Sequence, residues 1–197
     1  MKPTYSGYEG KRSRGGVQLP PVGQYEAVIQ AVKTEKSYSG DRDEIIMMIE
    51  ITEGEYKDQY HKVFEDQKER YGGDVKYKGS FKLRPPIDGD DPWIKKVFEG
   101  NLWCVEQSNP GYAWDWDEKK LVGKKIGINV RERLYTGNDG SDRSTTEIGQ
   151  FEPIDDVRNG KCKEMKVRDG RRSDSSAPAS TTGEGFTDVS AVVEVPF

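Results

Sequence analysis

Basic and aromatic side chains alternate along residues 75–84, an arrangement typical of a strand that binds nucleic acid. The even positions carry four cations, which are Lys76, Lys78, Lys82 and Arg84. In a β-strand these cations would share one face, where they could neutralise phosphates. Tyr77 and Phe81 between them offer flat rings on which bases can stack. The alternative is a solvated face with both rings in the core.

A second predicted strand, residues 124–134, places its cations on one face because they alternate with Ile126, Ile128 and Val130. Trp114 and Trp116 lie between a glycine and acidic residues, so we expect them to be partly exposed, whereas Trp93 and Trp103 should pack around a helix. The predicted DNA-binding residues are Lys57, Lys62, Lys76, Tyr77, Lys78, Phe81, Lys82, Arg84, Trp114, Trp116, Lys125, Arg131 and Arg133.

Catalytic signatures are missing from the chain. His61 is the only histidine, and there is no phosphate-binding glycine loop, HExxH motif or nucleophile with a plausible base. Acidic residues cluster at 88–91 and 115–118, where they could hold Mg²⁺ for phosphodiester cleavage, but turns and helix caps explain them better. We therefore expect a protein that is not an enzyme and needs no cofactor or metal, with a metal-dependent nuclease as the weakest alternative.

The charge is distributed unevenly along the 197 residues. The formal net charge is -4, yet the segment from Ser173 onward holds four acids and no base, so residues 1–172 carry equal numbers of acids and bases. Residues 1–18 are polar, glycine-rich and basic. The sequence predicts three parts: a flexible basic arm over 1–18, one folded domain over 19–172, and a disordered acidic tail over 173–197.

Short alternating segments indicate that the folded domain is mainly β. Strands are expected at 25–32 and 44–52 around a Ser-Gly-Asp turn, at 56–64, at 75–84, and in a late hairpin with Asn138-Asp139-Gly140 at its tip. Asp91-Pro92 begins a helix, because apolar residues then recur at helical spacing through Val105. This order fits a five-stranded OB-fold-like barrel with one helix. Another small β-barrel or sandwich fits almost as well.

The chain lacks the roughly 18 consecutive apolar residues of a membrane span and begins without an apolar signal region. Cys104 and Cys162 lie far apart, and neither belongs to a CxxC pair. We expect a cytoplasmic protein with reduced thiols and no membrane partner.

Three runs of the folded domain resemble one known family. The run LPPVGQYEAVI over residues 19–29, EGEYK over 53–57 and LVGKKIG over 121–127 are similar to a family of phage proteins from Gram-positive hosts that are associated with replication and recombination genes. The resemblance spans about residues 19–152. It implies an OB-like protein that binds single-stranded DNA in the host cytoplasm, and it transfers no catalytic residue.

The C-terminal tip Val195-Pro196-Phe197 resembles the Pro-Phe end of bacterial single-stranded-DNA-binding proteins, with Val193 and Glu194 where a run of aspartates would stand. This resemblance implies recruitment of replication or recombination proteins. The sequence leaves open an alternative, in which the domain is a protein-binding recombination accessory. It also leaves the oligomeric state open, a homo-oligomer included.

Overall fold

The computed structural model describes residues 16–171, so the predicted tail tip Val195–Phe197 and most of the basic arm lie outside the described residues. One six-stranded sheet dominates this part of the chain, with the strand order β3-β2-β1-β4-β5 and β6 paired to β4. The strands are β1 (Gly23–Lys36), β2 (Asp43–Ile51), β3 (Ser80–Leu83), β4 (Lys125–Thr136), β5 (Asp142–Glu152) and β6 (Arg168–Gly170). The helices are α1 (Gln59–Tyr71), α2 (Pro92–Ser108), α3 (Ile154–Arg158) and the short 3-10 helix η1 (Glu118–Leu121).

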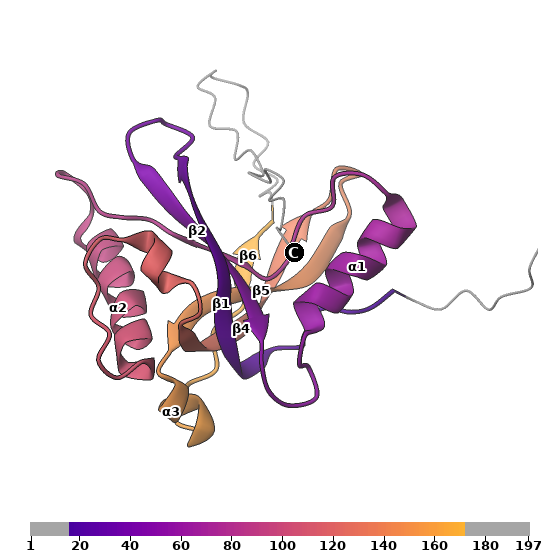
Figure 1. The fold of residues 1–197 in the computed structure, drawn as a ribbon. Helices are drawn as coiled ribbons and strands as arrows, with labels where there is room; N and C mark the ends of the chain where they lie inside the picture. Colours follow the sequence, from indigo (N-terminus) through magenta and orange to yellow (C-terminus); the bar gives the residue numbers. More distant parts are fainter. Residues whose placement is uncertain (1–15, 172–197) are drawn as a thin grey trace, which may run out of the picture.

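The long strand β1 joins the two halves of the sheet. Residues 23–28 pair antiparallel with β4, and residues 27–36 pair antiparallel with β2. The register with β2 shifts between Ile29 and Ala31, and a bulge of this kind bends a strand and increases its twist. The strand can therefore pair with two neighbours, β2 and β4, that run in different directions. In Figure 1 the tips of the β1–β2 and β4–β5 hairpins point away from each other.

The prediction of a mainly β protein is confirmed, but the sheet is open rather than a closed barrel. The edge strands β3 and β5 make no strand pairing with each other. They approach through their side chains, since the ring centroids of Phe81 and Phe151 lie 4.4 Å apart. The prediction of five strands with one helix was wrong, because residues 16–171 form six strands and three α-helices.

Helix α2 covers the apolar face of the sheet. Its N-terminus agrees with the sequence prediction: the Asp91 side chain accepts a hydrogen bond from the Trp93 amide at 2.7 Å, and Pro92 follows the cap. The core unites residues from α2 with alternate strand residues, among them Phe98, Leu102, Val105, Ala27, Ile29, Met47, Ile49, Ile126, Ile128 and Val130. Figure 1 shows α1 and α2 on opposite sides of the central strands.

Helix α1 replaces the strand predicted at 56–64. Tyr60 and Val63 are its buried residues, three positions apart as one helical face requires. The helix receives its N-terminal cap from another element, because the Glu50 carboxylate of β2 accepts hydrogen bonds from the amides of Tyr60 at 3.1 Å and His61 at 2.7 Å. The alternation of residues around Tyr56 therefore predicted a strand where the chain forms a helix.

The strand predicted at 75–84 is limited to the four residues of β3. Gly79, just before it, packs so tightly that an added Cβ would lie 2.4 Å from the Ile49 carbonyl oxygen. Both hairpins occur where they were predicted, and both cysteines are free thiols. Within residues 16–171, every helix is too short or too polar to span a membrane.

Candidate nucleic-acid interface

Three strands bring basic side chains together on one face of the sheet. Arg131, Arg133 and Tyr135 occupy alternate positions of β4, so they point to the same side. Their partners in β5 are Glu147, Thr145 and Arg143, and β6 adds Arg168 opposite Arg133. We call this set the arginine face: Arg131, Arg133, Tyr135, Arg143, Thr145, Glu147 and Arg168.

A single carboxylate lies among three guanidinium groups on the arginine face. The closest oxygens of Glu147 lie 2.8 Å from Arg131, 3.7 Å from Arg133 and 3.3 Å from Arg168. Three positive charges against one negative charge leave an excess of two. The Nε of Arg133 is also buried without a hydrogen-bond partner among the described residues. The face therefore holds positive charge and donor capacity that its own carboxylate does not use.

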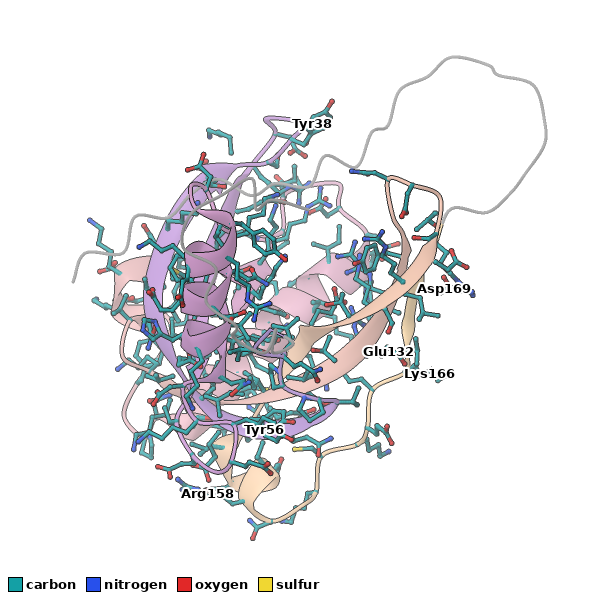
Figure 2. The ribbon with its side chains drawn as sticks, turned by 90° about the vertical axis from the view of Figure 1, so that its right-hand side faces the viewer. Tyr38, Tyr56, Glu132, Arg158, Lys166 and Asp169 are labelled. Carbon is teal, nitrogen blue, oxygen red and sulfur yellow. The ribbon has the colours of Figure 1, made fainter. Side chains whose placement is uncertain are left out.

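The pairing of β6 with β4 concentrates this charge. Arg133 and Arg168 are direct neighbours across the two parallel strands, where like charges are unfavourable, and the one carboxylate of Glu147 is shared between them and Arg131. In Figure 2, Glu132 of β4 and Asp169 of β6 lie along the same side of the molecule, with Lys166 on the chain that leads into β6. Several phosphates of a polyanion could supply the missing negative charge.

The arginine face includes one aromatic residue that sequence reasoning missed. Tyr135 is half-buried and lies opposite Gly170, which has no side chain to cover the ring. The alternation of Arg131 and Arg133 could have identified Tyr135 as the next residue on that face. Arg168 had no such signal, because it belongs to a basic segment whose pairing with β4 depends on the tertiary fold.

Lys125 is separated from the two predicted arginines of its strand. It begins β4 six residues before Arg131, which corresponds to about 20 Å along a strand. The structure thus brings Arg131 and Arg133 together and leaves Lys125 at the other end of β4, beside α2 and α3.

The two rings predicted to stack on bases are half-buried and pack against other side chains. The Tyr77 hydroxyl donates to the Glu50 carboxylate at 2.7 Å and to the Ile49 carbonyl at 3.1 Å. Burial, followed by the charge of Glu50, raises the pKa of Tyr77 far above its ordinary value. Phe81 packs on Phe151 between β3 and β5. Both rings are half-buried and packed against the core, as in the alternative left open by the sequence.

The lysines predicted alongside these rings are dispersed. Lys82 is paired with Glu44 at 2.8 Å. Arg84 follows β3, while Lys76 and Lys78 are exposed in the segment that precedes it. The two remaining cations, Lys57 and Lys62, lie at the start of α1, where the Lys62 ammonium donates to the Lys57 carbonyl at 2.6 Å. The four cations predicted on one strand face therefore do not share a strand.

The tryptophans differ from expectation in two of four cases. Trp116 is exposed and lies 5.8 Å from the Phe98 ring, whereas Trp114 is half-buried against the core. The prediction that Trp93 and Trp103 would be buried was wrong, since they are 63% and 52% exposed. They lie on the side of α2 away from the core residues Phe98, Leu102 and Val105, a phase that a helical wheel could have shown.

The acidic clusters serve the local structure. Asp90 binds the Arg42 guanidinium at 2.8 Å, and this hydrogen bond lowers the pKa of Asp90 to about 2. Asp91 caps α2, and Asp115 binds the Lys120 ammonium. Over residues 16–171, no three His, Cys, Asp or Glu side chains come together in a group that could hold a metal ion.

Comparison with protein-family models gives no match for this chain, and comparison with curated proteins gives none either.

Proposed function

We propose that the protein binds single-stranded DNA without chemistry and without strong sequence preference, in phage replication or recombination. The observation that carries this proposal is the excess positive charge of the arginine face. Phosphates neutralised by such a face release their counterions, which is the main source of sequence-independent affinity. Arginine suits this role because its planar guanidinium binds phosphate through two parallel hydrogen bonds.

The order of the strands supports the proposal. An OB fold is a five-stranded, partly open barrel that binds oligonucleotides with its second and third strands and with the loops between strands 1 and 2 and between strands 4 and 5. Here the edge strands β3 and β5 approach each other through Phe81 and Phe151, and α2 comes between β3 and β4 in the sequence. The corresponding loops are residues 37–42, with Tyr38 exposed, and residues 137–141, next to Arg143. We infer an OB-like arrangement.

Unpaired bases fit this surface better than a duplex does. Tyr135 lies on the arginine face, and Tyr38 is exposed in the loop between β1 and β2; bases of any identity can stack on such rings once they are unpaired. The helices α1 and α2 lie on either side of the central strands in Figure 1, and the arginine face is built from strands alone.

The test is a titration with poly-dT at several salt concentrations, followed by tryptophan fluorescence or anisotropy. Arg131→Gln with Arg133→Gln should weaken binding and flatten the salt dependence by about 1.4 in slope, because roughly 0.7 is lost for each single-strand phosphate contact. The control is Lys95→Gln with Lys96→Gln, which removes the same charge from exposed positions on α2. Equal effects of both pairs would refute a specific role of the arginine face.

One observation favours a second function, a protein-binding accessory. Trp93, Val97 and Trp103 are exposed on α2, and exposed tryptophans are enriched where proteins meet. If Trp103→Ala leaves poly-dT binding unchanged and abolishes association with a replication protein, the accessory function applies to α2. The same experiment with Pro196 and Phe197 removed tests recruitment through the C-terminal tip.

A further inference from the structure

A cationic pocket lies at the other end of β4 from the arginine face. Its volume is about 540 Å³, which falls within the range of small-molecule sites. The C-terminal end of α2 and the residues after it form one wall, through Asn109 and Tyr112. Lys124 and Lys125 at the start of β4 and Arg158 of α3 form the others. In Figure 2, Arg158 lies at the lower end of the molecule, away from Asp169 of β6.

Hydrogen bonds fix the three walls to one another. The Asn109 side chain accepts from the Lys125 amide at 3.1 Å and donates to the Lys125 carbonyl at 2.7 Å, which ties α2 to β4. The Ser108 hydroxyl accepts from the Ile154 amide at 3.0 Å and thereby ties α2 to α3. The walls are therefore preorganised, and a ligand would not have to order them.

Among residues 16–171, no acidic residue lines the pocket. The Lys124 ammonium lies 4.4 Å from the centroid of the Tyr112 ring, and neither Lys124 nor Lys125 forms an ion pair with any described residue. Arg158 differs, because Glu26 binds its guanidinium at 2.9 Å and 2.8 Å, and Asp155 lies 3.7 Å from it. Arg158 therefore contributes hydrogen-bond donors whose charge is compensated by carboxylates, and the two lysines are the cations that remain without an ion pair among the described residues.

We propose that this pocket binds a phosphate monoester, carried either by the 5′ end of a DNA strand or by a free nucleotide. A monoester has a charge of about -1.5 to -2 at neutral pH, which matches two lysines, whereas a diester within a strand carries only one negative charge. The strand-end source rests on the proposed binding of single-stranded DNA. The free-nucleotide source does not.

Calorimetric titration of the full chain with dTMP tests the pocket, with thymidine as the control that lacks the phosphate. We expect dTMP to bind and thymidine to show no heat. Binding should weaken from pH 7 to pH 5, because the second phosphate proton has a pKa of about 6. Thymidine binding as tightly as dTMP would overturn the proposal.

Variants assign the binding to the pocket. Lys124→Gln with Lys125→Gln should reduce dTMP affinity at least about tenfold, since each charged hydrogen bond contributes to binding on that order. Lys124→Arg with Lys125→Arg should retain binding, and Lys95→Gln with Lys119→Gln should match the parent protein. Unchanged dTMP affinity in the first variant would overturn the proposal.

Oligonucleotides distinguish the two sources. If the strand end is the ligand, a 5′-phosphorylated dT oligomer should bind more tightly than its 5′-hydroxyl counterpart, and the glutamine variant should abolish the difference. Equal binding of both oligomers, with dTMP still bound, supports the free nucleotide. If poly-dT binds and dTMP does not, the pocket proposal fails while the proposed function stands; the reverse result overturns only the proposed function.

Discussion

Replacing Glu147 with glutamine should strengthen the binding of single-stranded DNA, although the change removes three ion-pair contacts from the protein. In the parent chain the carboxylate neutralises one of three guanidinium groups, those of Arg131, Arg133 and Arg168. The variant Glu147→Gln keeps the shape of the side chain and makes the third positive charge available to a phosphate.

The size of the effect follows from this charge balance. One additional single-strand phosphate contact should steepen the slope of log K against log salt by about 0.7. Relative to the parent, the variant should therefore gain a factor of about 2.6 in affinity when salt is lowered from 200 to 50 mM. The fold should lose about 1 kcal/mol, because partly exposed ion pairs contribute only about 0.2 to 1 kcal/mol each.

The assay is a poly-dT titration at four or more salt concentrations, with urea denaturation of the same preparations. Glu99→Gln is the control, since it removes an identical charge from the Lys95 pair on α2. If Glu147→Gln keeps the parent slope or flattens it while the protein remains folded, the arginine face does not bind phosphate.

Three further results are expected. Tyr77→Phe should lower the free energy of unfolding by about 1 to 2 kcal/mol, because it removes the hydrogen bond that the hydroxyl donates to Glu50. Urea denaturation measures this loss, and a poly-dT titration of the same variant should give the parent affinity. A variant of parent stability with weaker poly-dT binding would contradict the prediction. The hydrogen bond from Arg42 lowers the pKa of Asp90 from its ordinary value of 3.8 to about 2 in the folded state, so the ionised carboxylate stabilises the fold fully above pH 3.8 and loses this effect as the pH falls toward about 2. Asp90→Asn removes this pH-dependent stabilisation, and the acid-unfolding curve measured by circular dichroism should shift accordingly. Deleting residues 173–197 should raise poly-dT affinity at low salt and have less effect at high salt, because four acids and no base are removed; a loss of affinity in the same titration would contradict this.

Elements whose signals are local were predictable from the sequence. The β1–β2 and β4–β5 hairpins follow from alternating residues around turns, with Gly40 and Gly140 at positive φ within the two turns. Helix α2 follows from its cap and from the helical spacing of its apolar residues. Helix α1 was missed because its cap comes from Glu50 in β2, and no local motif announces such a partner.

The same distinction applies to the candidate interface. Arg131 and Arg133 were predictable as neighbours on one face because they belong to one strand. Arg168 joins them only through the parallel pairing of β6, which is a tertiary contact. The alternating pattern around Tyr77 is the one expected of an exposed residue, so the sequence does not reveal that the ring is packed. Its packing depends on Glu50, which is distant in the sequence.

The buried carboxylate of Glu50 makes the formation of α1 depend on the sheet. Asp58, at the N-cap position, has φ of 58° and provides no side-chain hydrogen bond, so the 13-residue helix lacks a cap of its own. A helix of this length is marginal in isolation, and it gains its N-terminal acceptor only when β2 is in place. The Tyr77 hydroxyl reaches the same carboxylate from the segment that precedes β3. We therefore expect residues 52–79 to fold together with β2 as one cooperative unit, with α1 forming only once the strand that caps it is in place.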